Sequence, residues 1–360
     1  MKKYITILCS LSVIILAAAG CKKAQTDPTP AYDVPTTYNF SNANFSDATT
    51  RLGMYTEMSN LMKTGLTAQL NGTALKNMFS NAASPFATAA YNTSGINIKD
   101  QCASVFQADV LNNIDSLVKA CNSGQAASHG IAGIGASSAT PTSKYALTGT
   151  GVNYSQVFSK GLMGGLITYQ IVTTMDAVAK LSIDNTTVVN GETAMEHAWD
   201  LAFGYWGVPI DFPTNKTGVK LWGSYSSQVD SGFKANKILM GAFLKGRAAI
   251  SHKDNATTTA QANIIITTME RLTAAAVLQE INEIKASISD NMARNSRLSE
   301  CYGFVYSLKY NPKKVITDAQ INAILALFPK NFYNLTITDV NNIQAAVATL
   351  YNFVGVEDIL

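Results

Sequence analysis

The chain has 360 residues, of which 14% are charged and 47% are hydrophobic. This length and hydrophobic content suffice for one large or two ordinary folded domains, and they exclude a disordered chain. The formal net charge of +3 includes no basic excess of the kind that nucleic-acid-binding proteins show, so we expect no nucleic-acid partner.

The first twenty residues have the features of a lipoprotein signal peptide. Lys2 and Lys3 precede an apolar run that is too short to span a bilayer comfortably, and small residues then precede Cys21. This order resembles the lipobox of bacterial lipoproteins, in which the cysteine is acylated, for example with palmitate. We therefore predict a signal peptide over 1–20 and lipidation of Cys21. The alternative is an ordinary secretory signal with a chance cysteine.

The next segment, 21–38, is predicted to be an extended tether because prolines and threonines recur along it. The body that follows contains Cys102, Cys121 and Cys301. Cys102 and Cys121 lie in one predicted helix at a separation of about 28 Å, whereas a disulfide needs Cα atoms within about 7 Å. The cysteines therefore indicate neither a disulfide framework nor a zinc site.

Apolar residues recur through the body at spacings of three and four, which predicts amphipathic helices. The predicted helices span 46–64, 100–120, 153–181, 192–206, 228–251, 261–288, 292–309, 318–327 and 339–353. Thr317 and Gln320 form a capping box before the eighth of these. The polar, glycine-rich stretch 122–152 favours a surface excursion, with room for a short hairpin around 131–134 and 144–147.

Long amphipathic helices with few alternating stretches predict an all-α fold. Eight or nine helices exceed one four-helix bundle, so we expect two adjacent helical bundles that divide near residue 220. The first bundle would span 39–220 and the second 221–360.

The stretch that begins Glu196-His197-Ala-Trp199-Asp200 is the most informative for chemistry. On a helix, His197 and Asp200 share a face and Glu196 lies one step round. Such a pair holds a metal, or lets the carboxylate orient the imidazole for acid–base chemistry. The alternative is a structural hydrogen bond at the helix surface.

Glu300, on the predicted helix 292–309, is a further candidate ligand, because carboxylates on facing bundle helices form oxygen-rich iron sites. Iron or another divalent metal is the cofactor that this set would hold. The predicted metal ligands are Glu196, His197, Asp200 and Glu300. The alternative for Glu300 is a buried ion pair with an arginine such as Arg247 or Arg297.

Three blocks carry a resemblance to a known family. They are Tyr154-Ser-Gln156-x-x-x-Lys160-Gly161-Leu-Met163-Gly164-Gly165, Glu196-His197-Ala-Trp199-Asp200-x-x-Phe203-Gly204-Tyr205-Trp206-Gly207-Val-Pro209 and Ser299-Glu300-Cys-Tyr302-Gly303-Phe304-Val-Tyr306-Ser-Leu308. They resemble DUF4856, a domain-of-unknown-function family of Bacteroidota lipoproteins. The glycines of the first block are expected to let a neighbouring helix approach closely.

That family in turn resembles, more distantly, the imelysin-like proteins, which are helical envelope lipoproteins of two bundles associated with iron acquisition. Their Gly-x-His-x-x-Glu motif matches outright only at His197, since Met195 replaces the glycine and Asp200 the glutamate. The resemblance implies an outer-membrane lipoprotein held by its N-terminal lipid. It would bind a ligand or an envelope uptake partner in iron or haem acquisition.

The sequence contains no His-Glu-x-x-His motif, no phosphate-binding loop and no Gly-x-Ser-x-Gly motif. Its three histidines are few for a hydrolytic zinc centre. We therefore expect a binding protein rather than an enzyme. A metal-dependent peptidase of imelysin type and a purely structural surface lipoprotein remain alternatives. Lys22 and Lys23 follow Cys21 without an acidic run, which favours the periplasmic face of the outer membrane over the cell surface.

Overall fold

Helices account for most of the chain that the computed structural model describes, residues 31–360. The predicted signal peptide and the predicted lipidation site, Cys21, lie outside the described residues. Strands within 31–360 form only two short antiparallel pairs, so the prediction of an all-α fold is confirmed. No helix in this part of the chain is long and apolar enough to cross a membrane.

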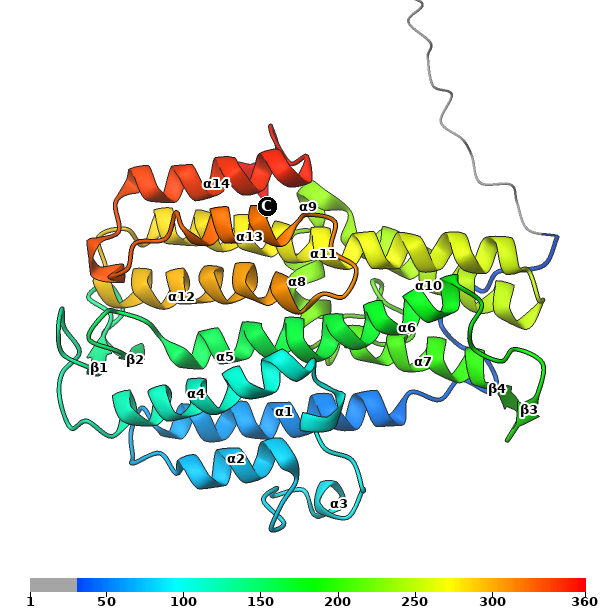
Figure 1. Ribbon diagram of the computed structural model, residues 1–360, viewed down its shortest axis with the longest axis horizontal. Helices are drawn as coiled ribbons and strands as arrows, with labels where there is room; N and C mark the ends of the chain where they lie inside the picture. Colours follow the sequence, from blue (N-terminus) through cyan, green and yellow to red (C-terminus); the bar gives the residue numbers. More distant parts are fainter. Residues whose placement is uncertain (1–30) are drawn as a thin grey trace, which may run out of the picture. The chain divides into compact units, whose positions relative to one another are not determined.

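The first half of the chain folds into helices that lie side by side (Figure 1). They are α1 (Ser46–Thr64), α2 (Gly72–Ser80), α3 (Ala89–Asn92), α4 (Ser104–Cys121), α5 (Tyr154–Leu162), α6 (Tyr169–Ala179) and α7 (Ala194–Trp206). Helix α1 has the predicted bounds, whereas α2 and α3 were not predicted. Helix α4 begins later than predicted, because Lys99–Gln101 forms a separate 3-10 turn before it.

The second half continues the same packing. Its helices are α8 (Trp222–Gln228), α9 (Asp230–Phe233), α10 (Ala235–Ser251), α11 (Asn255–Ala286), α12 (Asn291–Ser307), α13 (Asp318–Leu325) and α14 (Ile337–Tyr351). The predicted helix 228–251 is interrupted because Lys234 adopts a left-handed conformation. The capping box of Thr317 and Gln320 is confirmed at the start of α13.

The predicted short hairpin is present in the glycine-rich stretch. Strand β1 (Gly133–Ala136) pairs antiparallel with β2 (Lys144–Leu147), and β3 (Val188–Val189) pairs with β4 (Glu192–Thr193). Strand β4 takes up the two residues with which the predicted helix 192–206 began. The three cysteines of the body are free and buried, and Cys102 lies before the start of α4.

Helices α5 and α6 are joined by a π-helical turn over Met163–Thr168. Its glycines permit close packing: a Cβ on Gly165 would lie 2.4 Å from Phe106 of α4, and one on Gly164 would lie 2.4 Å from Ser307 of α12. The Trp222 indole donates to the Met163 carbonyl at the start of this turn, at 3.1 Å.

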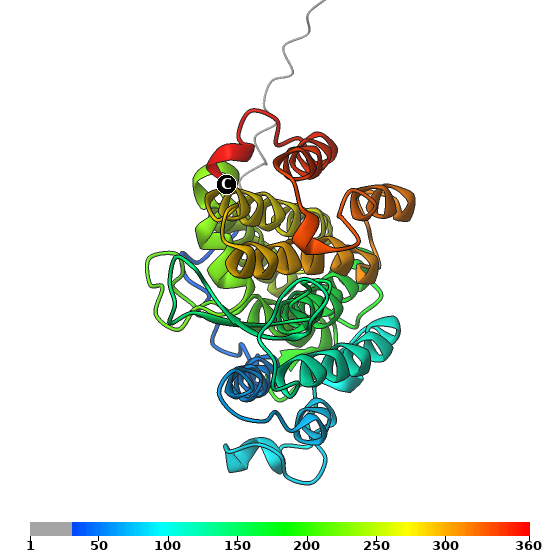
Figure 2. The ribbon, with the colours of Figure 1, turned by 90° about the vertical axis from the view of Figure 1, so that its left-hand side faces the viewer.

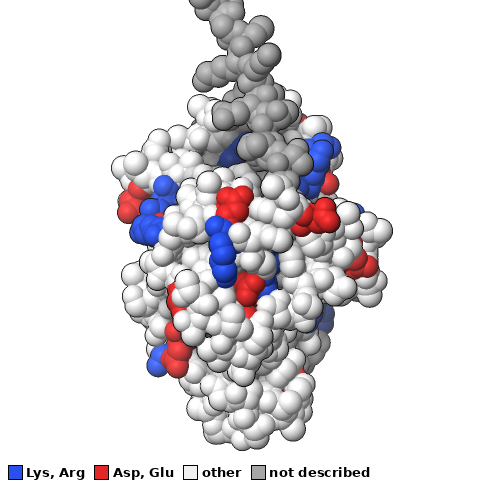
Figure 3. Space-filling model, turned by 90° about the vertical axis from the view of Figure 1, so that its right-hand side faces the viewer, with Lys and Arg blue, Asp and Glu red and all other residues white. Residues whose placement is uncertain are grey.

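Helices from both sides of residue 220 pack directly on one another. Helix α5 contacts α12, α6 contacts α11, and α7 contacts α10. Viewed along the helices, the chain runs from the blue α1 through the green α5 to the red α14 (Figure 2). Residues Val34–Leu360 form one compact unit, so the predicted division near residue 220 would lie inside it. On the face shown in Figure 3, lysines and arginines are interspersed with acidic side chains, and most of the surface is uncharged.

Candidate functional site

Helix α7 carries three of the predicted metal ligands, and its start is fixed by a capping box. The Thr193 N–H donates to Glu196 Oε2 at 2.9 Å, and the Glu196 N–H donates to Thr193 Oγ1 at 3.2 Å. This start places Glu196 and Asp200 four residues apart on the buried face of the helix.

Both carboxylates bind one arginine of α10. Arg247 Nη1 lies 2.8 Å from Glu196 Oε1, and Arg247 Nε lies 2.8 Å from Asp200 Oδ1. The Arg247 side chain is 0% exposed. Burial raises the pKa of Asp200, while Arg247 and other hydrogen-bond donors oppose that shift. The guanidinium supplies several donors in a fixed geometry, which lets these charges stay out of water.

The same arginine fastens the segment that precedes α1. Arg247 Nη2 donates to Asn42 Oδ1 at 2.9 Å, and its guanidinium lies 5.1 Å from the Phe40 ring centroid. The Tyr38 hydroxyl donates to Asp200 Oδ1 at 2.6 Å. We call Tyr38, Asn42, Glu196, Asp200 and Arg247 the Arg247 cluster. It joins the end of the predicted tether to α7 and α10, which is a structural role.

His197 lies apart from the Arg247 cluster. Its side chain is 39% exposed, and its Nδ1 lies 3.0 Å from Glu192 Oε1. Glu196 and Asp200 are four positions apart and lie on the buried face of α7. His197 is one position after Glu196, so its side chain points away from that face and towards the solvent. The predicted pairing of His197 with Asp200 is not among the interactions of the described residues.

Glu300 of α12 belongs to a different cluster. Its Oε1 lies 2.6 Å from Lys160 Nζ of α5, and the Tyr225 hydroxyl of α8 donates to the same oxygen. Lys160 Nζ also lies 4.9 Å from the centroid of the Tyr225 ring. The alternative predicted for Glu300, a buried ion pair, is therefore what the structure shows, with a lysine in place of the expected arginine. This pair joins two of the three family blocks.

Glu280 of α11 completes this Glu300 cluster of Lys160, Tyr225, Glu280 and Glu300. Its Oε1 lies 3.3 Å from the Tyr225 hydroxyl. Burial and the nearby Glu300 carboxylate raise the pKa of Glu280 to about 8. Burial also disfavours the charge of Glu300, but the Lys160 ammonium outweighs it and lowers the pKa of Glu300. At neutral pH, the Glu280 carboxyl group is therefore protonated and the Glu300 carboxyl group is ionised.

The four predicted metal ligands therefore occupy three separate environments. Across residues 31–360, no group of three or more His, Cys, Asp or Glu side chains is arranged to hold a metal ion. A metal at Glu196 and Asp200 would have to displace Arg247, whose guanidinium already pairs with both carboxylates. The residues present do not fit the predicted metal.

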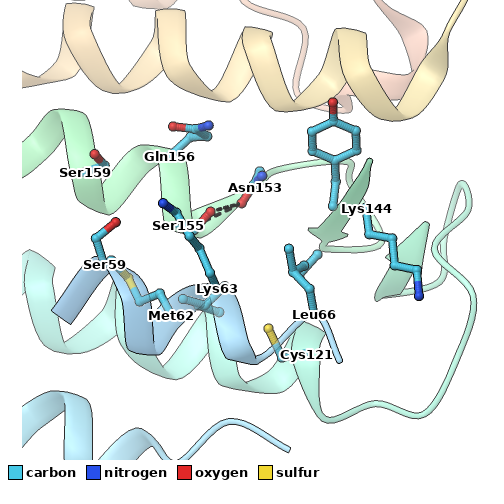
Figure 4. Close-up of a pocket in the computed structure, with 13 residues that line it drawn as sticks. Ser59, Met62, Lys63, Leu66, Cys121, Lys144, Asn153, Ser155, Gln156 and Ser159 are labelled. Carbon is cyan, nitrogen blue, oxygen red and sulfur yellow. Dashed lines mark hydrogen bonds between the residues drawn. The ribbon is translucent and has the colours of Figure 1, made fainter. Parts of the chain in front are cut away.

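A small polar pocket lies among α1, α4, α5 and β2 (Figure 4). Its volume is about 200 Å³. Met62, Leu66, Leu117 and Ala146 supply apolar surface, and hydroxyl and amide groups come from Ser59, Asn153, Ser155, Gln156 and Ser159. We call this the polar pocket.

The local structure of α5 arranges one wall of the polar pocket. Asn153 caps the helix, and its Oδ1 accepts hydrogen bonds from the Ser155 N–H at 3.1 Å and the Ser155 hydroxyl at 2.7 Å. The Ser159 hydroxyl is hydrogen-bonded to that of Tyr55 on α1. These contacts fix hydroxyl groups along the wall.

Lysines supply the only charged side chains of the polar pocket. Lys63 and Lys144 both line it and are exposed, and no Asp or Glu is part of the lining. Neither lysine takes part in an ion pair recorded for the described part of the chain. Sequence reasoning missed this pocket because four distant segments form it. The one available signal was that Ser155 and Gln156 belong to the first family block.

Together these features define an all-helical protein with buried ion-pair clusters and one small, lysine-bearing polar pocket. The sequence profile of the family described as domain of unknown function (DUF4856) matches residues 35–354. The chain therefore belongs to the DUF4856 family, which confirms the resemblance of the three blocks. Comparisons with curated proteins and with solved structures found no match.

Proposed function

We propose that this chain is a lipid-anchored protein of the bacterial cell envelope that binds a small anionic ligand and catalyses no reaction. The observation that carries the binding role is the polar pocket, in which two lysines meet serine, asparagine and glutamine side chains without a carboxylate. Lysine ammonium groups attract an anion, and the Gln156 amide offers N–H donors for its oxygens, whereas the Ser155 hydroxyl already donates to Asn153.

The size of the polar pocket limits the ligand. Its volume of about 200 Å³ is below the range of roughly 300–1,000 Å³ that is typical of pockets for drug-sized ligands. A small carboxylate or phosphate compound suits this volume, whereas a haem macrocycle is too large. Iron or haem acquisition is the process suggested by the resemblance to imelysin-like proteins. An iron chelate of a small carboxylate, such as ferric citrate, is consistent with both observations, because it carries iron and its negative charge complements the lysines of the pocket.

Three of the buried carboxylates favour binding over catalysis. A general base must be free to accept a proton from a substrate. Glu196, Asp200 and Glu300 are each held by a cationic side chain within 2.8 Å instead. The envelope location depends on the leader, in which Lys2 and Lys3, the apolar run and Cys21 occur in the order of a lipoprotein signal.

Calorimetric titration tests the ligand class on protein that begins at Lys22. The double variant Lys63→Ala and Lys144→Ala is expected to bind citrate or ferric citrate at least about tenfold more weakly than the wild type, a loss of about 1.4 kcal/mol. Lys119→Ala is the matched control, because Lys119 is an exposed lysine of α4 outside the pocket lining. Equal affinity in the double variant, or no binding of citrate, ferric citrate or phosphate to the wild type, would contradict the proposal.

Metabolic labelling tests the anchor. We expect a palmitate label on the wild-type protein in a bacterial host and none on Cys21→Ser, which should accumulate without the lipid. A Cys102→Ser variant is the control, since Cys102 is buried in the body. Absence of the label from the wild-type protein would show that the leader is an ordinary secretory signal, and a label retained on the Cys21 variant would place the lipid on another residue. Protease treatment of intact cells then distinguishes the periplasmic face, which protects the protein, from the cell surface.

A further inference from the structure

A second pocket lies on the other side of α5 and is walled by tyrosines. Tyr154, Val157 and Gly161 of α5 line it, and their spacing of three and four residues places them on one helix face. Its volume is about 170 Å³. The other side chains come from α4, α12 and the turn that follows α12: Asp109, Asn113, Tyr302, Tyr306 and Tyr310. We call this the tyrosine pocket.

The tyrosine rings of α12 and the following turn form a continuous aromatic wall. The Tyr302 and Tyr306 ring centroids are 5.9 Å apart and the ring planes meet at 22°. The Tyr306 and Tyr310 centroids are 5.8 Å apart with an angle of 73° between the planes. The four-residue steps along the chain produce this row, because they bring the side chains to one face.

Asp109 places a negative charge in the same pocket. The Tyr310 hydroxyl donates to its Oδ2 at 2.6 Å. Burial and the Asp109 carboxylate raise the pKa of Tyr306, so its hydroxyl stays neutral. Among the ion pairs of residues 31–360, none neutralises Asp109 with a lysine or arginine. The pocket thus combines a carboxylate that has no ion-pair partner in the described part of the chain with four tyrosine side chains.

The ammonium group of Lys309 already lies over one of these rings. Lys309 Nζ lies 4.8 Å from the Tyr306 ring centroid, and Lys309 is not part of the pocket lining. The contact shows that a positive charge is accommodated on this ring.

We infer that the tyrosine pocket binds a small organic cation of the quaternary ammonium class. Aromatic rings attract such ions through their negative faces, and a nearby carboxylate adds charge complementarity. A quaternary ammonium donates no hydrogen bond. It is therefore suited to a wall composed mainly of rings, whereas a primary ammonium has three N–H groups to satisfy. This inference is independent of the anion proposed for the polar pocket, because the two pockets share no lining residue.

Titration with choline and with 3,3-dimethylbutan-1-ol, its uncharged isostere, tests this inference on the mature protein. We expect choline to bind at least tenfold more tightly than the isostere. Asp109→Asn and, separately, Tyr302→Leu should each weaken choline binding about tenfold. Asp115→Asn should not, because Asp115 is an exposed residue of α4 that pairs with Lys76 at 2.6 Å, away from the pocket.

Asp109→Asn retains an acceptor for Tyr310, so it tests the charge even if Tyr302→Leu fails to fold. Equal binding of choline and the isostere would overturn the inference, as would unchanged choline affinity in a folded Asp109→Asn protein. Binding of glucose but not of choline would overturn it in favour of a carbohydrate site.

Discussion

Replacing Arg247 by alanine is expected to lower the free energy of unfolding by about 3–5 kcal/mol, the usual effect of breaking a buried ion pair. Arg247 is fully buried and binds both Glu196 and Asp200 at 2.8 Å. Without it, both carboxylates stay in the core without a cation, and the hydrogen bond to Asn42 is also lost. Urea denaturation followed by circular dichroism measures the change.

His197→Ala is the matched control, since His197 is on α7 with Glu196 and Asp200 but its side chain is 39% exposed. It should change stability by no more than about 0.5 kcal/mol. The triple variant Arg247→Met, Glu196→Gln and Asp200→Asn should recover part of the loss, because it removes the unpaired charges. A loss of stability in His197→Ala as large as that in Arg247→Ala would contradict the structural role of the Arg247 cluster.

Replacing Glu280 by glutamine is expected to stabilise the protein at about pH 9 and to leave it nearly unchanged at about pH 5. The pKa of Glu280 is raised from 4.5 to about 8, first by burial and then by Glu300. The folded protein therefore binds more protons than the unfolded chain between these values. The stability that protonation provides is fully present below pH 4.5 and is lost as the pH rises through 8. A glutamine side chain is neutral at every pH, so the Glu280→Gln variant does not lose this stability at high pH.

The other groups of this cluster do not titrate in the same interval. Glu300 has a lowered pKa and Lys160 a raised one, so both stay charged, while burial raises the pKa of Tyr225 and Cys301 and keeps them neutral. The difference in the free energy of unfolding between wild type and Glu280→Gln is expected to grow by about a few kcal/mol from pH 5 to pH 9.

Asp115→Asn is the control for this pH dependence. Asp115 lies outside the Glu300 cluster and pairs with Lys76 at 2.6 Å, and its side chain is 62% exposed. We expect no pH-dependent difference for it. Parallel stability profiles of wild type and Glu280→Gln would show that Glu280 is ionised in the folded protein.

The helices of this protein could be predicted from apolar spacing, but their interruptions could not. Helix α1 and the capping box before α13 follow from local sequence signals. The π-helical turn after Leu162 depends on neighbouring helices, because Gly164 and Gly165 lie in close contact with Ser307 and Phe106. The break at Lys234 was missed because a lysine gives no local signal for a left-handed conformation. Helix α2 was missed because it is short and its buried face is small.

The site predictions show the same limit. The three-residue spacing predicted that His197 and Asp200 share a face of the helix. In the structure, Asp200 shares the buried face with Glu196 instead, because both carboxylates pair with Arg247, which is distant in sequence. The buried ion pair of Glu300 was an open alternative, and its partner Lys160 could not be selected without the packing of α5 on α12. The polar pocket was not predicted because its lining comes from four segments that are distant in sequence.

A crystal structure of the protein soaked with citrate would test the central claim most directly. We predict a bound anion in the polar pocket, whose lining includes Lys63 of α1, Lys144 of β2 and Ser59. An empty pocket at a citrate concentration that saturates binding in solution, or citrate bound only elsewhere, would contradict it.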